Sequence, residues 1–178
     1  MQDNIAAFGG DPKNVLLFGQ SAGASSTSAH VAAPRSAGLF HRAIIESGPP
    51  ADWAQYTLDD ADARAQVIAQ RVNCTQSDAK AWVACMRAAN ASLLIKEDSV
   101  PSLHNPVIHW AAVIDGVEFK ESLQAMWQAG KTNPLDALLL GTVVDEVGGR
   151  KPKRVPGNKV HIHLNCTLLI GNTRVPSL

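Results

Sequence analysis

The hydrophobic pattern of the first fifty residues predicts a strand–helix–strand unit. Residues 15–18 form a short continuous apolar run, Val-Leu-Leu-Phe, which is typical of a strand buried on both faces of a parallel sheet. Small residues over 24–33 then predict a helix that ends before Pro34, and apolar residues return in a second predicted strand, 42–47. A helix between two strands within about thirty residues predicts a parallel βαβ connection.

The pattern further along predicts more helices and one more buried strand. Apolar positions three to four apart predict a surface helix over 57–72, and shorter helices are predicted over 78–89 and 118–129. Residues 113–116, Val-Ile-Asp-Gly, predict an extended segment that enters a turn, and the apolar run 138–142 predicts another strand. This alternation of strands and helices predicts an α/β fold.

The pattern changes near residue 149. Prolines and a glycine exclude a helix in the next segment, and alternating apolar and polar residues over 160–165 predict a half-exposed strand without a visible partner. We therefore expect a folded domain over 1–149 and a discordant tail over 150–178 that is unstructured or artefactual and does not join the sheet.

Composition and charge narrow the class of protein. With 178 residues, of which 46% are hydrophobic and 18% charged, the chain has the size and composition of one globular domain. Its longest apolar run, 137–144, is too short to cross a bilayer, and no signal peptide is recognised. Residues 1–146 carry a net charge of −6 and residues 147–178 a net charge of +6. An acidic body argues against a nucleic acid partner, and the basic tail is expected to be solvated.

The cysteines and asparagines carry a weak signal for an oxidising compartment. Cys74 and Cys85 are separated by a loop and part of a short predicted helix, so they form either a disulfide or two unrelated buried thiols, and the residues alone leave both open. Glycosylation sequons begin at Asn73, Asn90 and Asn165. Together these features favour a secretory setting.

One motif carries chemistry. Residues 19–23, Gly-Gln-Ser-Ala-Gly, fit the G-x-S-x-G pattern and lie between a buried strand and a small-residue helix, where a nucleophile elbow must occur. We expect both glycines to be required because a Cβ at either position would collide with the neighbouring strand or helix. Ser21 would then be exposed on a strained turn, and the backbone N–H of Ala22, at the helix start, could donate to an oxyanion.

A serine nucleophile needs a base and an acid that orients the base. In this kind of fold the acid follows a later strand, and Glu146 or Asp145 meets that description. The base should come later still, where only His161 and His163 occur, in the discordant tail, and we do not expect either to serve. Two histidines are also too few for a metal site. The earlier histidines, such as His30 and His41, are expected to be structural.

Several stretches of the chain resemble one known family. Residues 4–12 (NIAAFGGDP), 15–23, 36–43 (SAGLFHRA) and 46–48 (ESG) are similar to the type-B carboxylesterases, the carboxylesterase–cholinesterase–lipase group of the α/β-hydrolase fold. The resemblance extends more loosely to residue 149. It implies a partial α/β-hydrolase fold with an incomplete sheet, and hydrolysis of small carboxylic esters through an acyl-enzyme without a cofactor or metal.

The resemblance also implies roles for individual residues. It makes Ser21 the nucleophile, Glu146 the acid and the N–H of Ala22 an oxyanion donor. It further implies a disulfide between Cys74 and Cys85, a place for Trp53 in the acyl pocket, and a hydrogen bond from Ser47 to the acid.

The chain also departs from this family. Neither the Gly-rich loop that completes the oxyanion hole nor a histidine in a G-x-x-H context after Glu146 is present. We therefore expect an internal fragment of a secreted esterase, with little or no activity by itself. Gln20, where cholinesterases usually have Glu, favours a general carboxylesterase. The alternative is a catalytically silent, cholinesterase-like binding or adhesion protein, which the retention of Ser21 disfavours.

Overall fold

The computed structural model describes residues 1–48, 50, 55–97, 111–143 and 164–170. The chain forms two compact units, one made of residues 1–51 and 121–178 and the other of residues 52–120.

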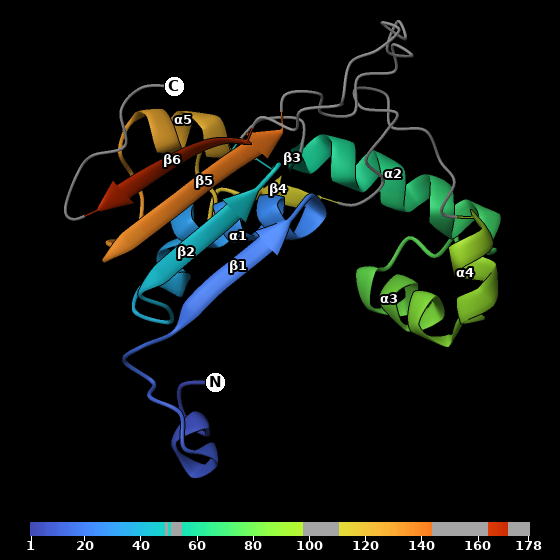
Figure 1. The fold of residues 1–178 in the computed structure, drawn as a ribbon. Coiled ribbons are helices and arrows are strands. Elements are labelled where there is room, and N and C mark those ends of the chain that lie inside the picture. The colour runs from blue at the N-terminus through green and yellow to red at the C-terminus, as the bar shows by residue number, and fades with distance from the viewer. Residues whose placement is uncertain (49, 51–54, 98–110, 144–163, 171–178) are drawn as a thin grey trace, which may run out of the picture. The chain divides into compact units, whose positions relative to one another are not determined.

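The first unit is built on a four-stranded sheet (Figure 1). Its elements are a 3₁₀ helix η1 (Ile5–Phe8), β1 (Leu16–Gln20), α1 (Ala22–Ala32), a 3₁₀ helix η2 (Pro34–Ser36), β2 (Arg42–Glu46), α5 (Leu123–Gln128), β5 (Ala137–Val143) and β6 (Leu164–Ile170). The strand order is β1-β2-β5-β6, in which β1, β2 and β5 are parallel and β6 is antiparallel to β5. The predicted βαβ unit and α/β fold class are confirmed.

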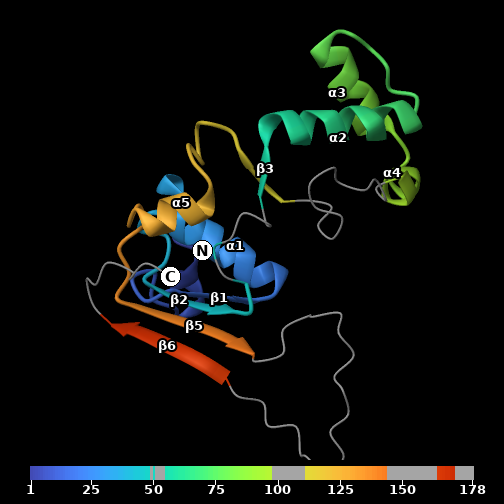
Figure 2. The ribbon, with the colours of Figure 1, turned by 90° about the horizontal axis from the view of Figure 1, so that it is seen from above.

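Both α1 and α5 lie on the same side of this sheet (Figure 2). The residues that face them are in register across the strands and include Ala43 and Leu138, which are almost fully buried. The opposite face carries Leu16 and Phe18, which are 47% and 69% exposed. The prediction that this strand is buried on both faces is therefore wrong, because Leu16 and Phe18 are exposed on one of them. β1 is also an edge strand of the described sheet.

The tail contributes a strand that was expected to have no partner. β6 pairs with β5 along its whole length, from Leu164 opposite Val143 to Ile170 opposite Ala137. A physical reason is that the side of β5 away from β2 offers free backbone donors and acceptors, which an extended apolar segment can pair with. For residues 164–170, the expectation that the tail does not join the sheet is wrong. The expected boundary near residue 149 lies outside the described residues.

The second unit consists mainly of helices. It contains β3 (Gln55–Thr57), α2 (Leu58–Arg71), α3 (Ala79–Ala88), α4 (Ala91–Glu97) and β4 (Ala112–Ile114), and β3 pairs with β4 in parallel. Polar N-caps start the predicted helices: the side chain of Thr57 accepts from the Asp60 amide, and that of Asp78 from the Ala81 amide. Both predicted helices, 57–72 and 78–89, are confirmed, whereas α5 in the first unit is shorter than the predicted 118–129.

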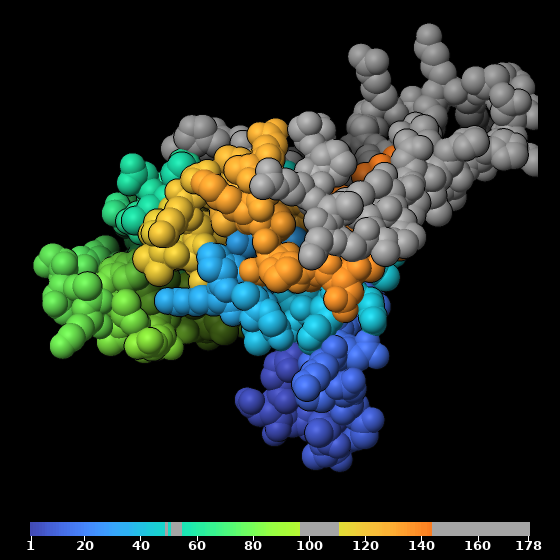
Figure 3. Space-filling model, turned by 90° about the vertical axis from the view of Figure 1, so that its left-hand side faces the viewer, coloured from blue at the N-terminus to red at the C-terminus, as the bar shows by residue number. Residues whose placement is uncertain are grey.

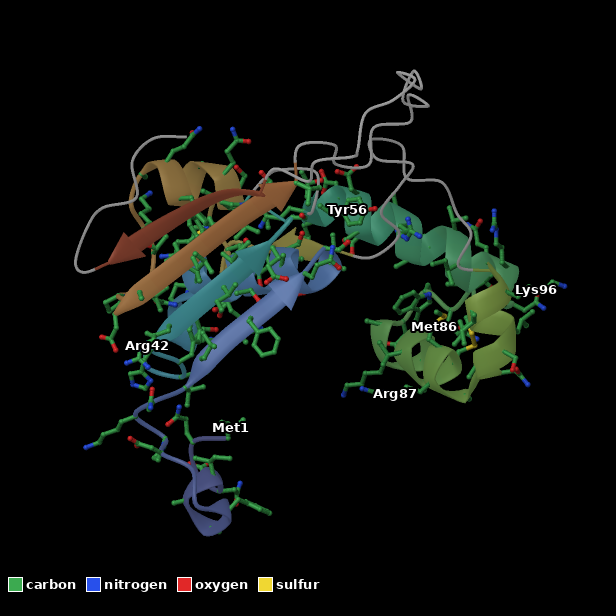
Figure 4. All side chains as sticks on the ribbon, in the orientation of Figure 1. Met1, Arg42, Tyr56, Met86, Arg87 and Lys96 are labelled. Carbon is green, nitrogen blue, oxygen red and sulfur yellow. A yellow bond between two sulfur atoms is a disulfide. The ribbon has the colours of Figure 1, made fainter. Side chains whose placement is uncertain are left out.

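A disulfide bond links two elements of this unit. Cys74 is bonded to Cys85 with their Cα atoms 5.7 Å apart, so the pairing implied by the resemblance is confirmed. Cys74 belongs to a buried cluster with Ala69 and Val72, against which Trp82 and Met86 pack (Figure 4 labels Met86). The bond therefore joins the loop after α2 to α3.

The extended segment β4 ends in a turn organised by one carboxylate. Oδ1 of Asp115 accepts hydrogen bonds from the amides of Val117, Glu118 and Phe119, at 2.9, 2.8 and 3.1 Å. Gly116 takes a positive φ of 73° inside this turn. The backbone hydrogen bonds, led by that of Phe119, hold the pKa of Asp115 below its ordinary value of 3.8, since they favour the charged form.

Across the described ranges, no helix is long and apolar enough to cross a membrane.

Candidate active site

Ser21 lies at the sharp turn between β1 and α1 (Figure 1). Its backbone has φ 55° and ψ −120°, a conformation that L-residues rarely adopt, and its side chain is exposed. Such strain costs about 1–3 kcal/mol and persists only where the surroundings hold it. The Ser21 amide donates to the carbonyl of Glu46 at 2.9 Å, which ties the turn to β2. This is the strained elbow that the motif predicted.

Two glycines let the backbones around Ser21 approach closely. A Cβ on Gly19 would lie 2.3 Å from the backbone carbonyl group of Gly23 and 2.9 Å from the amide nitrogen of Ala24. A Cβ on Gly48 would lie 2.7 Å from the carbonyl oxygen of Ser21 and 2.8 Å from the amide nitrogen of Ser25. Neither position can accept a side chain without moving main-chain atoms of the elbow.

The second glycine of the motif behaves differently from our expectation. A Cβ on Gly23 would meet nothing within 4 Å, so the prediction that it would collide is wrong. The difference lies in the neighbours: a Cβ added to Gly19 would meet the backbone of the first turn of α1, whereas a Cβ added to Gly23 would enter open space. Gly48 was not singled out from the sequence, although its place after a strand and beside another positive-φ residue, Ser47, marks it in the structure.

The start of α1 provides hydrogen-bond donors beside Ser21. Ala22 is the first helical residue and is exposed, and the Ser21 side chain makes no capping bond. The first amides of a helix have no acceptor within the helix, and they lie at the positive end of its dipole. The Ala22 N–H is therefore suited to stabilising a negative charge that develops near Ser21.

The carboxyl ends of three parallel strands meet at this site. Gln20, Glu46 and Gly141 are in register across β1, β2 and β5. The next residue after β2, Ser47, has a φ of 55° and donates its amide to the Gly141 carbonyl at 2.7 Å. The described part of β5 ends at residue 143, so Asp145 and Glu146 lie outside the described residues, close in sequence to this edge.

Residues distant in sequence anchor α1 to the rest of the unit. Oγ of Ser28 donates to the Gly48 carbonyl at 2.9 Å, and the carbonyl of Ser28 accepts from Nε1 of Trp127 at 3.2 Å. At the carboxyl end of the helix, Nδ2 of Asn133 donates to the carbonyls of His30 and Ala33, at 3.0 and 2.8 Å. Figure 3 shows the orange residues of the segment that includes β5 lying beside blue residues from the first part of the chain. The sequence carried no signal for the contacts of Trp127 and Asn133 with α1, which span 99 and 103 residues.

The structure places some of the other predicted residues and leaves some outside its described part. Trp53, His161 and His163 lie outside the described residues, as does Glu146. Of the earlier histidines, His41 Nδ1 accepts from the Val15 amide at 3.4 Å, and His30 Nδ1 lies 2.9 Å from Oγ of Ser36, both local structural contacts.

The three sequons differ in their surroundings. Asn73 is exposed, with a φ of 61° after α2, and Asn90 is exposed at the start of α4, where its Oδ1 accepts from the Leu93 amide at 3.2 Å. Asn165 lies in β6, in register with Thr142.

Among the described residues, no three His, Cys, Asp or Glu side chains cluster as they would around a metal ion.

Arg42 marks the opposite end of the sheet from Ser21. It is labelled in Figure 4 at the amino end of β2, where its guanidinium donates to Oδ1 of Asn14 and lies 4.0 Å from the Asp136 carboxylate. The charged contacts of this end therefore hold strand starts together and are separate from the elbow.

The chain is similar in sequence to one protein family and to individual relatives. A model of the carboxylesterase family matches residues 1–163. The chain is 36% identical over 149 residues to an acetylcholinesterase of Bungarus fasciatus, and 36% identical over 155 residues to an acetylcholinesterase of Danio rerio. These matches cover 82% of the chain but 24% and 23% of the relatives, so the chain spans about a quarter of their length.

Proposed function

Because the chain belongs to the carboxylesterase family, we propose that the protein containing it hydrolyses small carboxylic esters through an acyl-enzyme on Ser21. The observation that carries the proposal is the strained elbow, in which Ser21 is exposed between a parallel strand and the amino end of α1. A non-glycine residue held in this conformation by close main-chain packing is costly, and it presents a hydroxyl where a substrate carbonyl can reach it.

In the proposed reaction, Ser21 is the nucleophile and the backbone N–H of Ala22 is one oxyanion donor. Oγ of Ser21 attacks the ester carbonyl and gives its proton to a histidine, while the Ala22 N–H stabilises the oxyanion. The same proton then leaves with the alcohol, and water cleaves the acyl-enzyme by the reverse sequence. Glu146 orients the histidine, which is supplied by residues outside 1–178. No cofactor is needed because the chemistry is acyl transfer. Trp53 is proposed to line the acyl pocket.

Because the proposed mechanism needs a histidine from outside residues 1–178, it makes a prediction for these residues alone. Removing one member of a catalytic triad typically costs about 10⁴-fold in rate, and removing one oxyanion donor costs about 10²–10³-fold. We propose that the 178-residue chain turns over esters little or not at all, whereas the longer protein that contains it is active. Measurable turnover of a p-nitrophenyl ester by the chain, abolished in Ser21→Ala, would overturn this part of the proposal.

A fluorophosphonate probe tests the nucleophile in the longer protein, because the probe reacts only with an activated serine. We expect one labelled site, in the peptide that contains Ser21, and no label in Ser21→Ala. Ser26→Ala is the matched control, since Ser26 is also exposed on α1 but lies one turn further along. Labelling that persists in Ser21→Ala would refute the assignment. A folded longer protein that is never labelled would favour the silent binding or adhesion protein instead.

We further propose that the protein matures in the secretory pathway. The disulfide supports an oxidising compartment, and the sequons at Asn73, Asn90 and Asn165 supply candidate glycosylation sites, of which the first two are on exposed residues. Expression in a secretory host should give a heavier product that an endoglycosidase returns to its sequence mass. A product of unmodified mass would exclude glycosylation at all three sites.

A further inference from the structure

The second unit contains a groove that the proposed ester chemistry does not use. It lies between α2 and the start of α3 and is lined in part by Cys74 of the disulfide. Its volume of about 440 Å³ is in the range of small-molecule sites. One wall is a single face of α2, on which Asp62, Gln66 and Gln70 recur at helical spacing. The loop after α2 and Trp82 of α3 form the rest.

The polar groups of the groove suit a ligand that both donates and accepts hydrogen bonds. Gln66, Gln70 and Gln76 each offer an amide with two donors and an acceptor, and the hydroxyls of Thr75 and Ser77 add two more groups of mixed character. Of the described residues that line it, one is acidic and none is basic, so an anion would find no counter-charge. A neutral polyol is the chemical class that matches this set.

The apolar groups of the groove add a flat and rigid wall. Trp82 is half-buried and packs against Ala69 and Cys74, and the disulfide holds this cluster together. A large aromatic side chain fixed in this way presents contact area without losing rotamer freedom on binding. A pyranose ring has an apolar C–H face to lie on such a wall and a rim of hydroxyls to meet the amides.

We propose that this groove binds a neutral sugar ring, with the ring against Trp82 and its hydroxyls bonded to Gln66 and Gln70. The sugar has two possible sources with the same chemistry. Asn73 is exposed and directly precedes Cys74 and Thr75 of the groove, so a glycan attached there would begin beside it. The other source is a free or foreign saccharide. The glycan source rests on the glycosylation proposed above, whereas sugar binding itself does not.

The test uses the 178-residue chain made without glycosylation, with its disulfide formed. N-acetylglucosamine is titrated while the side-chain amide signals of Gln66 and Gln70 and the indole signal of Trp82 are followed by NMR. We expect saturable shifts with a dissociation constant of about 1 mM, as is usual for a ligand of this size. The double variant Gln66→Ala/Gln70→Ala should bind at least about tenfold more weakly.

Controls keep the result independent of folding and of esterase activity. Gln66 and Gln70 are exposed, so their replacement should leave the amide spectrum of the unit intact. Gln124→Ala, an exposed glutamine on α5, should bind like the unchanged chain. Absence of saturable shifts up to about 50 mM sugar, or equal binding by the double variant, would overturn the proposal. Neither outcome bears on Ser21.

A second arm identifies the source of the sugar. The chain is made in a glycosylating host and compared with Asn73→Gln from the same host. If the glycan on Asn73 fills the groove, free N-acetylglucosamine should bind the variant and not the glycosylated chain. Equal binding by both would assign the groove to a free or foreign saccharide, and failure of both to bind would overturn the proposal.

Discussion

The elbow geometry makes a sharp prediction about two glycines that the motif treats as equivalent. In Gly19→Ala, the new Cβ would lie 2.3 Å from the backbone carbonyl group of Gly23, about 1 Å short of an ordinary contact. In Gly23→Ala, the new Cβ meets nothing within 4 Å, and the residue is helical. We expect the first change to break the elbow and the second to stabilise it.

The size of the difference follows from the atoms involved. Overpacking usually costs about 1–3 kcal/mol when side chains can move aside, and here both partners are main chain, so we expect at least about 3 kcal/mol for Gly19→Ala. Replacing a helical glycine by alanine gains about 0.5–1 kcal/mol, because glycine loses more backbone freedom on folding. Against a typical domain stability of about 5–15 kcal/mol, the gap between the two variants is large.

Hydrogen exchange measured by mass spectrometry can localise this effect. Peptides that cover residues 16–32 report on β1 and α1, separately from the second unit. A loss of about 3 kcal/mol corresponds to exchange about a hundredfold faster in Gly19→Ala, while Gly23→Ala should exchange two- to fivefold more slowly, as rough estimates. Equal protection in Gly19→Ala and the unchanged chain, or equal damage from the two substitutions, would refute the reasoning.

Three further predictions follow from single features of the structure. Replacing Cys74 and Cys85 by serine should destabilise the α2–α3 pair by about 3 kcal/mol, measured by urea unfolding, because the disulfide closes a short loop in the unfolded chain. The turn at Asp115 should be intact above pH 3.8 and be lost as the pH falls through the lowered pKa of the folded state. The reason is that only the charged carboxylate accepts all three hydrogen bonds strongly, and the amide NMR shifts of residues 117–119 measure the loss. Asn133→Ala should cost about 1–3 kcal/mol and raise exchange at the carboxyl end of α1, which loses two hydrogen bonds to carbonyls.

Each of these predictions has a result that contradicts it. Unchanged urea stability in the serine variant would show that packing alone holds α2 to α3. Amide shifts of residues 117–119 that begin to change well above pH 3.8 would mean that the pKa of Asp115 is not lowered. For Asn133, the matched control is Gln128→Ala, a change at an exposed residue of α5, and equal exchange in the two variants would count against the anchoring role.

Much of the local structure could be predicted because its causes are local. Apolar spacing and polar caps such as Thr57 and Asp78 fix where α2 and α3 begin and end, within a few neighbouring residues. The elbow motif likewise placed Ser21 on a strained turn before a helix, because a G-x-S-x-G pattern between an apolar run and a run of small residues is typical of a nucleophile elbow. Conversely, the short α4 was missed, since seven residues give too weak a periodicity.

What the sequence by itself determined about this protein is therefore its α/β class, its family, the turn at Ser21 before a helix and most of its helices. The tertiary structure alone decided which neighbours each element meets. It placed β1 at an edge with Phe18 exposed, gave the tail strand β6 a partner in β5, and made Gly48 rather than Gly23 the second tight position at the elbow. It also joined Asn133 to α1. These outcomes depend on contacts between residues far apart in the chain, and no local pattern encodes the direction from which a distant neighbour arrives.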